Sequence, residues 1–292
     1  MRISDQQVLD LTQYQMNSAY DQMARAQTVL ASGKRINSPA DDPIGATTAL
    51  ELQGNLAELN QFSSTASDAL NWMQTTDSAY NDVGDVLQQV RTLAVQAANG
   101  TLSQDERQAM AASVGQLLQQ AVQSANATYD GRYVLAGYQT GTSPFVVANG
   151  VVTYHGDSGA IQQEVSPGQM MQINMPGNAA LPAVFSSMTQ LQRDLQAGNT
   201  AAIGGADLQA IDDAHAGLLV AQATVGTGTN RLQAIQQALQ SRQNTTTGQV
   251  SQIVDADMAQ AAIDFSSRQA TYQAALSAAS RVIQPSLLEF LK

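Results

Sequence analysis

The 292-residue chain contains no cysteine, and only 5% of its residues are aromatic. Without thiols it can form neither a disulfide nor a thiolate metal site, and a cysteine nucleophile is excluded. Much of the 43% hydrophobic share is alanine, which buries little area per residue. Thin packing between helices is therefore favoured over a thick globular core.

Charge and long apolar runs are scarce as well. Charged residues make up 13% of the chain, about half the usual share, and lysine occurs only at Lys34 and Lys292. The net charge of -11 and the pI of about 4.4 argue against binding to nucleic acid or to an anionic membrane surface. The first 30 residues hold no apolar signal-peptide core, and no run of 18 apolar residues occurs. Neither classical secretion nor a membrane span is expected.

Proline and glycine divide the chain into three zones. The segment from Gly131 to Pro182 carries eight glycines and four of the seven prolines, whereas the zones on either side read as helical. Within it, Asn149-Gly150 stands between two β-branched runs, which is the signature of a hairpin with a type I′ turn. With further strands expected at Ile161–Val165 and Met170–Met175, the zone predicts a small four-stranded sheet that leans on the helices.

The N-terminal helical zone predicts a rod. A helix from Pro43 to Ala98 would be about 80 Å long at 1.5 Å per residue, which is too long to fold around a compact core. Asn99-Gly100 ends it, and the capping box Ser103–Glu106 opens another helix towards Thr128. A seam with steps of three and four is predicted along the long helix, at Leu56, Leu59, Ser63, Ala66, Leu70, Met73, Asp77, Tyr80, Gly84, Leu87, Arg91 and Ala94.

Both chain ends carry apolar stripes at helical spacing. Met16, Tyr20, Met23 and Leu30 form the first, and the second runs from Met258 through Phe265 and Tyr272 to Val282, with Arg268 as a discordant member. Each stripe fits a core seam within one chain and fits packing against other subunits equally well.

Candidates for chemistry are poor. His155 and His215 lie in different zones without partners at metal-ligand spacing, and Gly33-Lys34 lacks the upstream glycine of a phosphate-binding loop. Asp255 and Asp257 lack the glycine that a calcium loop requires. No catalytic residue, cofactor site or metal site is therefore expected, and the chain is predicted not to be an enzyme.

The stretch Ala31–Gly45, "ASGKRINSPADDPIG", predicts a stop and restart between two helices. Gly33 suits the left-handed position after a helix, where Lys34 and Arg35 would lie near the negative end of the helix dipole. Ser38 before Pro39, and Asp42 before Pro43, each place a capping residue ahead of a proline at a first helical position. Asp41 would join Asp42 at a positive helix start, so this inter-helix joint is structural rather than catalytic.

Several segments then match a family. The stretch "LASGKRINSPADDPIGATTA" (Leu30–Ala49) resembles the N-terminal signature of bacterial flagellins and their junction relatives, and "VRTLAVQAANGTLS" (Val90–Ser103) resembles the end of their long helix. The C-terminal matches are "VGTGTNRL" (Val225–Leu232) and "DADMA" (Asp255–Ala259). The segments "DGRYVLAGYQTGTSPF", "TYQAAL" and "PSLLEFL" are more similar to the hook–filament junction members of the family than to filament flagellins, although a short filament flagellin stays the alternative.

The resemblance implies a mainly α, elongated, coiled-coil-like rod with a small inserted β-rich outer domain. Residues 1–44 with 252–292 would form the inner terminal-helix domain, 45–130 with 183–251 the helical rod, and 131–182 the outer domain. The terminal helices would pair on assembly. Subunit contacts are then expected at Met16, Tyr20, Met23, Leu30, Phe265, Tyr272, Val282, Leu287, Leu288 and Leu291.

The same resemblance implies the protein's neighbours. Hook-associated protein 1 is expected on the hook side, flagellin on the filament side and copies of the chain itself around a ring, with an export chaperone at the C-terminal helix. The protein would be secreted to the flagellum through the type III export apparatus without a cleavable signal peptide.

Overall fold

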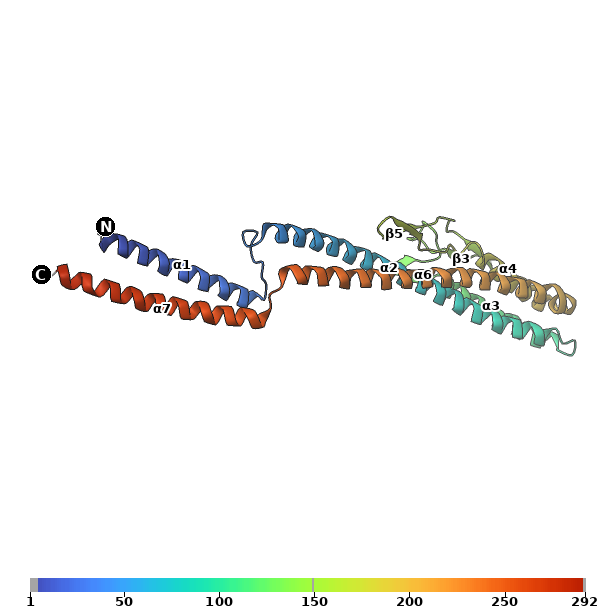
Figure 1. Ribbon diagram of the computed structural model, residues 1–292. Coiled ribbons are helices and arrows are strands. Elements are labelled where there is room, and N and C mark those ends of the chain that lie inside the picture. The colour runs from blue at the N-terminus through green and yellow to red at the C-terminus, as the bar shows by residue number, and fades with distance from the viewer. Residues whose placement is uncertain (1–4, 149, 291–292) are drawn as a thin grey trace. The chain divides into compact units, whose positions relative to one another are not determined.

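The computed structural model describes residues 5–148 and 150–290, which are mostly helical (Figure 1). The chain divides into two compact units. The terminal unit comprises Met1–Glu58 and Arg242–Lys292, and the middle unit comprises Leu59–Ser241. Among the described residues, no helix combines the length and the hydropathy that a membrane span requires.

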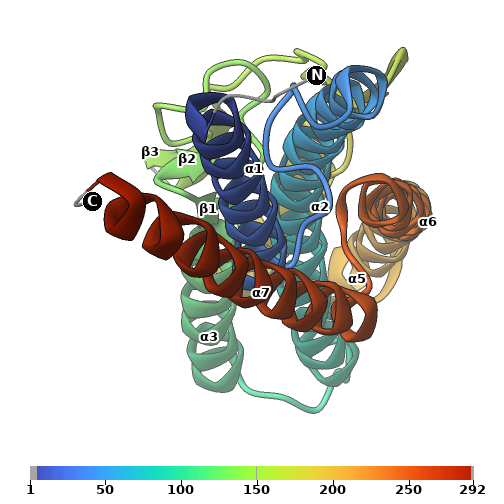
Figure 2. The same cartoon turned by 60° about the vertical axis from the view of Figure 1, so that its left-hand side comes forward.

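The terminal unit is built on the two chain ends. Helix α1 (Asp5–Ser32) lies against α7 (Met258–Phe290), as both views show (Figures 1 and 2). The unit also holds the first turns of α2 (Pro43–Ala97) and the last turns of α6 (Leu208–Val254). The predicted mainly α fold and the long helix that starts at Pro43 are both confirmed.

The middle unit contains the rest of α2 and α6 together with shorter helices. Helix α3 (Gln104–Ala125) opens at the predicted capping box, in which Glu106 N donates to Ser103 Oγ at 3.3 Å and Ser103 N donates to Glu106 Oε2 at 2.7 Å. Helix α4 (Leu181–Ala197) packs against α3. A short helix α5 (Thr200–Ala202) and a π-helical turn, η1 (Ile203–Asp207), lead into α6.

The predicted seam along α2 consists of two columns of residues, in which successive members lie seven positions apart. The buried face of the helix agrees with one of these columns and differs from the other. The column Ala66, Met73, Tyr80, Leu87 and Ala94 is buried as predicted. In the other column the prediction was wrong at Arg91, which is exposed and pairs with Asp212 of α6 at 2.6 Å. The true second column has a higher content of apolar residues than the predicted one, which explains why it is the one that packs. It consists of Ala69, Thr76, Val83, Val90 and Ala97.

The inserted zone holds hairpins rather than the predicted four-stranded sheet. Each pair of strands forms its own two-stranded antiparallel sheet, so the expectation of one sheet was wrong. The hairpin around Gly150 is confirmed, with Val146 opposite Thr153. The pairs are β1 (Thr128–Tyr129) with β2 (Arg132–Tyr133), β3 (Phe145–Ala148) with β4 (Val151–Tyr154), and β5 (Gln162–Ser166) with β6 (Gln169–Gln172).

Aromatic packing joins the hairpin β3–β4 to helix α4. Phe145 at the start of β3 is 2% exposed, and its ring packs on Phe185 of α4 with centroids 5.1 Å apart. Tyr154 of β4 also packs on Phe145, with centroids 5.0 Å apart. Burying the ring of Phe145 against helix α4 stabilises the hairpin β3–β4, because the ring removes a large apolar area from water.

A buried carboxyl group lies in the π-helical turn. Asp207 is 3% exposed, and its Oδ2 has no hydrogen-bond partner among the described residues. Asp194 of α4 is close enough to add a second negative charge, while its own oxygens accept from Gln190 and Asn199. Burial, reinforced by Asp194, raises the pKa of Asp207 to about 6.

The raised pKa makes the stability of the middle unit depend on pH. In the unfolded chain Asp207 loses its proton near its ordinary pKa of about 4, so folding becomes less favourable as the pH rises from about 4 to about 6. Asp207→Asn keeps the shape and removes the charge. We expect it to raise the free energy of unfolding at about pH 8 by on the order of 1–3 kcal/mol, with a smaller gain at about pH 5.

Urea unfolding followed by circular dichroism measures both values. Asp82→Asn on the exposed side of α2 is the matched control, and its stability should change little at either pH. Equal stability of Asp207→Asn and the unaltered protein at about pH 8 would contradict the assignment of a charged, buried Asp207.

Candidate functional site

The inter-helix joint begins where α1 ends. Gly33 has a φ of 69°, in the left-handed region that favours glycine, and its N–H donates to Val29 O at 2.9 Å. This is the helix end that the sequence predicts. The chain reverses at this point and leaves the axis of α1.

After Gly33 the chain pairs with a segment more than two hundred residues away. Arg35 N donates to Val254 O at 2.7 Å, and Ala256 N donates to Gly33 O at 2.9 Å. Lys34 and Asp255 form the antiparallel bridge between these two bonds. The connector between α1 and α2 is thereby joined to the connector between α6 and α7, and the two form a two-stranded joint within the terminal unit.

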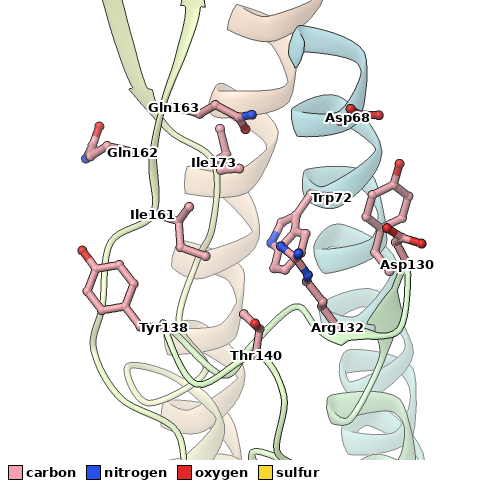
Figure 3. A pocket seen from close by; sticks show the side chains of 11 residues that line it. Asp68, Trp72, Asp130, Arg132, Tyr138, Thr140, Ile161, Gln162, Gln163 and Ile173 are labelled. Atoms are coloured by element: carbon pink, nitrogen blue, oxygen red, sulfur yellow. The ribbon is translucent and has the colours of Figure 1, made fainter. Parts of the chain in front are cut away.

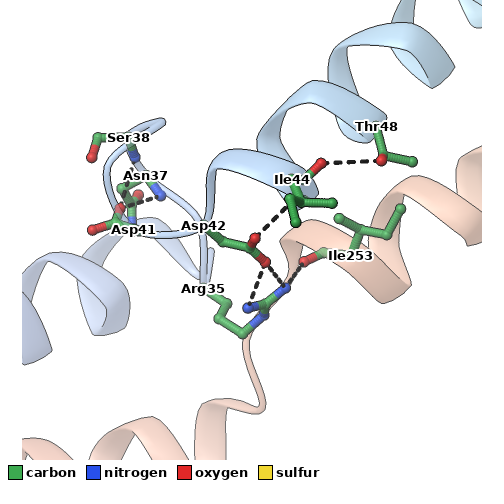
Figure 4. A network of polar contacts seen from close by, with 9 residues as sticks. Arg35, Asn37, Ser38, Asp41, Asp42, Ile44, Thr48 and Ile253 are labelled. Carbon is green, nitrogen blue, oxygen red and sulfur yellow. Dashed lines mark hydrogen bonds and ion pairs between the residues drawn. The ribbon is translucent and has the colours of Figure 1, made fainter.

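Arg35 anchors this joint through its side chain. Its Nη2 donates to Ile253 O at 2.7 Å, and both terminal nitrogens reach Asp42 Oδ2 at 3.3 Å (Figure 4). The carbonyl of Ile253 belongs to the last turn of α6, where helix carbonyls lack partners and carry partial negative charge. The expected helix-dipole contact of Arg35 was therefore assigned to the wrong helix, since the reversal at Gly33 carries the guanidinium to α6 instead of α1.

The two aspartates act at different places. Asp42 Oδ1 accepts from Gly45 N at 2.9 Å, so Asp42 caps α2 with Pro43 at the first helical position, as predicted. Asp41 Oδ2 accepts from Asn37 N at 3.1 Å and from Ser38 N at 2.8 Å (Figure 4). Asp41 therefore closes a turn and does not stand at a helix start, contrary to the expectation.

The predicted helix start at Ser38-Pro39 is also wrong. Residues 38–41 form a turn, in which Asp41 N donates to Ser38 O at 3.0 Å. Because the Asp41 carboxylate takes the amide hydrogens at Asn37 and Ser38, the segment is held as a loop. Only one helix restarts in the joint, at Pro43.

Hydrogen bonds from the backbone keep both carboxylates charged. The bond from Ser38 N, followed by that from Asn37 N, lowers the pKa of Asp41 below its ordinary value. For Asp42 the bond from Gly45 N is the main cause of a lowered pKa, and Arg35 adds to it. The joint is thus stabilised above the ordinary aspartate pKa of about 3.9 and weakens as the pH falls through the lowered values.

Ile36 and Gly45 complete the joint, and the sequence did not single them out. Ile36 is 8% exposed, although its neighbours in the joint are exposed. A Cβ added to Gly45 would lie 2.7 Å from Ile36 Cδ1 and 2.4 Å from Asp42 Oδ2. The signal available in the sequence was one isoleucine within a polar stretch, which indicates a buried anchor.

The predicted interface residues lie along the contact between α1 and α7. Tyr20 and Tyr272 pack with ring centroids 5.6 Å apart, and Arg268, the discordant member of the C-terminal stripe, donates from Nη1 to Gln22 Oε1. Tyr20 keeps 52% of its surface exposed. The half-buried members are Met16, Met23, Leu30, Phe265 and Tyr272. These residues thus pack in the seam between α1 and α7 of one chain. Their contacts with other subunits remain a prediction.

Four predicted interface residues cannot be placed. Leu291 lies outside the described residues, and so do the side chains of Val282, Leu287 and Leu288 at the end of α7. Their role as contacts between subunits remains a prediction.

A second set of apolar residues on the terminal helices faces solvent. Leu11 and Tyr14 on α1 are 58% and 73% exposed, and Ile263 and Leu276 on α7 are 62% and 41% exposed. Sequence reasoning missed them because it followed the single column with the best seam spacing. Large apolar side chains on two faces of one helix are typical of a helix that packs against more than one neighbour.

Histidines and acidic residues form no metal site in the part of the chain that the structure describes. His215 Nε2 lies 2.9 Å from Gln88 Nε2, and His155 Nε2 lies 2.9 Å from Thr153 Oγ1. Asp257 caps α7, because its Oδ1 accepts from Ala259 N at 2.9 Å. These groups have partners within the fold.

The paired chain ends, their joint and the small strand-containing insertion define the class, a helical structural protein. The model of the bacterial flagellin N-terminal helical region matches residues 3–140, and that of the C-terminal helical region matches residues 208–291. Together they match more than half of the chain, which therefore belongs to the bacterial flagellin family. Its fold and family are those of structural components of the flagellum.

Two relatives are flagellar hook-associated proteins 3. That of Escherichia coli K12 is 28% identical over the whole of both chains. That of Salmonella typhimurium is 30% identical over 65% of this chain, an alignment that spans only 58% of that relative. Flagellins also match, over 43% to 85% of this chain.

The solved structures agree on the fold. The crystal structure of Bacillus cereus FlgL matches 69% of this chain and 99% of its own, with a TM-score of 0.62 and 24% sequence identity.

Arg35→Gln tests the anchor of the joint. The variant loses the charge-assisted bonds to Ile253 O and Asp42. We therefore expect the backbone amides at positions 35 and 256 to exchange hydrogen faster than in the unaltered protein. Hydrogen exchange with mass spectrometry measures this. Arg231→Gln, which removes the same charge from an exposed position of α6, should leave the joint unchanged. Unchanged exchange in both variants would show that the backbone pairing holds without Arg35.

Proposed function

We propose that this chain is a structural subunit of the bacterial flagellum that forms the junction between hook and filament. The observation that carries the proposal is the end-to-end alignment with hook-associated protein 3, a similarity that includes both terminal helices and the joint between them. Flagellins match less of the chain, so a filament subunit is the second candidate. The proposal assigns the protein no enzymatic activity.

Assembly would use the terminal helices. Residues 1–44 with 252–292 would form an inner domain, residues 45–130 with 183–251 a helical rod and residues 131–182 an outer domain. Met16, Tyr20 and Met23 and their partners on α7 already share a seam within the chain. Contacts with neighbouring subunits would then add Leu11, Tyr14, Ile263 and Leu276, whose exposed apolar surfaces would leave water when a neighbouring helix covers them.

The proposed neighbours follow from the family. Hook-associated protein 1 would lie on the hook side, flagellin on the filament side and further copies of this chain around the ring. An export chaperone would hold the C-terminal helix before assembly. Export to the flagellum would proceed through the type III apparatus without a cleavable signal peptide.

Deletion of the gene tests the function. A junction subunit is required to attach the filament, so electron microscopy of the deletion strain should show hooks without filaments, with flagellin shed into the medium. Attached filaments of normal length would contradict the junction role. The purified protein separates the second candidate, because a flagellin seeded with filament fragments should elongate into long filaments and a junction subunit should not.

Charge on the exposed apolar face should block assembly. Burying a leucine-sized side chain stabilises a contact by about 1.5–3 kcal/mol, so the double variant Leu11→Glu, Tyr14→Glu should raise the concentration needed for assembly by at least about tenfold. Motility in soft agar and filament counts of the complemented deletion strain measure the effect. Asn17→Glu, on an exposed position of α1, is the control for added charge. Normal motility of the double variant at normal export levels would remove Leu11 and Tyr14 from the interface.

A further inference from the structure

A pocket of about 620 Å³ lies in the middle unit (Figure 3). Three elements converge on it. Helix α2 contributes Asp68 and Trp72, one turn apart, and the hairpin β1–β2 contributes its turn. The third wall comes from Ile161, from the first two residues of β5 and from Ile173, which follows β6. The volume is in the range of sites for small molecules.

The turn of the β1–β2 hairpin is built for one conformation. Asp130 has a φ of 49° and Gly131 a φ of 71°, so both central residues are left-handed, as a two-residue type I′ turn requires. Asp130 is the one non-glycine residue with positive φ within the described ranges. The turn places Tyr129 opposite Arg132, and both side chains line the pocket.

Tyr138 is an exposed aromatic ring that is nevertheless fixed. It is 64% exposed, yet its hydroxyl donates to Ala160 O at 2.9 Å and its N–H donates to Asp157 Oδ1 at 2.7 Å. One face of the ring lies so close to Gly159 that a Cβ there would be 2.1 Å from Tyr138 Cδ2. The bond to Ala160 and the contact with Gly159 fix the ring while much of it stays exposed, so the ring presents a preorganised flat surface.

Trp72 supplies the inner aromatic wall. It is 7% exposed and packs edge-on against Tyr129 with centroids 6.2 Å apart. Its indole Nε1 is buried and donates no hydrogen bond within the described residues, which is unusual because buried donors nearly always have partners. The exposed side chain of Arg132 extends towards this indole (Figure 3).

Polar side chains surround the aromatic surfaces. In the region that the structure describes, Asp68, Asp130 and Arg132 form no ion pair and no side-chain hydrogen bond, and the same holds for Gln162 and Gln163. Carboxylates, amides and a guanidinium offer both acceptors and donors. Their formal charges sum to minus one in a chain of net charge -11, so an anionic ligand is disfavoured.

A flat aromatic face beside planar polar groups, such as the exposed ring of Tyr138 presents, is what a sugar ring requires. The C–H faces of a pyranose pack on aromatic rings, and its hydroxyls exchange hydrogen bonds with carboxylates, amides and guanidinium groups. We propose that the pocket between Trp72 and Tyr138 binds a neutral saccharide of about two or three rings. This inference does not depend on the junction role.

Trp72 is the single tryptophan of the chain, so its fluorescence reports on the pocket alone. The full-length protein is titrated with maltotriose, cellotriose and triacetylchitotriose, with sorbitol as the control for solvent effects and trigalacturonic acid as the anionic arm. We expect a saturable change in emission with at least one neutral trisaccharide, and saturation-transfer NMR should show contact with its ring protons. Trigalacturonic acid should bind more weakly.

Two variants locate the binding. Tyr138→Ala removes the flat surface and should weaken binding by about tenfold or more, whereas Tyr14→Ala, which removes a comparably exposed tyrosine from α1, should leave it unchanged. If circular dichroism shows that Tyr138→Ala is unfolded, Asp68→Ala takes its place, because Asp68 is exposed and has no side-chain bond to lose. We expect it to weaken binding severalfold.

Three results would overturn the inference. They are the lack of a saturable response to any of the neutral trisaccharides into the tens of millimolar range, undiminished binding by the folded pocket variant, and tighter binding of trigalacturonic acid than of the neutral sugars. Because none of these measurements involves assembly, they leave the junction proposal untouched.

Discussion

The backbone pairing between the segment after α1 and the segment before α7 is the constraint on which the terminal unit depends. Its two central bonds join Arg35 to Val254 and Ala256 to Gly33. They fix the point from which both terminal helices start, so the rings of Tyr20 and Tyr272 meet at comparable chain distances from the joint. The side chain of Arg35 adds a second fixed point, because it binds the end of α6 and the cap of α2 together.

This arrangement leaves the terminal helices with two apolar faces. One face forms the seam between α1 and α7, and the other, marked by Leu11 and Ile263, remains in water. A helix pair that satisfied only itself would have a polar outer face. The exposed face therefore provides a physical reason for assembly, and it agrees with membership of a family of structural flagellar components.

The middle unit follows a different principle, in which close packing of its buried core fixes the position of exposed groups. Tyr80, Phe145 and Phe185 are among its largest fully buried residues. The same helix α2 that buries Tyr80 presents Asp68 to solvent and holds Trp72 at the wall of the pocket. The hairpin β1–β2 contributes Tyr129 and its turn to that pocket, and the ring of Tyr129 packs edge-on against Trp72 of α2.

Local sequence by itself determined the long helices, several of their ends and the hairpin around Gly150. The capping box at Ser103, the left-handed Gly33 and the cap at Asp42 each depend on residues within four positions, so the pattern of residue types was enough. The family was also readable, because its motifs are contiguous segments of the chain. The joint was recognised as structural for the same reason.

Only the tertiary structure decided which groups meet across the sequence. The partner of Arg35 at Ile253 lies 218 positions away, and nothing near either residue signals the other. The second buried column of α2, the separation of the hairpins and the convergence of Trp72 with Tyr138 likewise depend on packing between distant elements. Packing favours whichever column or hairpin face removes the most apolar area from water, and that area is defined only when the neighbouring elements are in place.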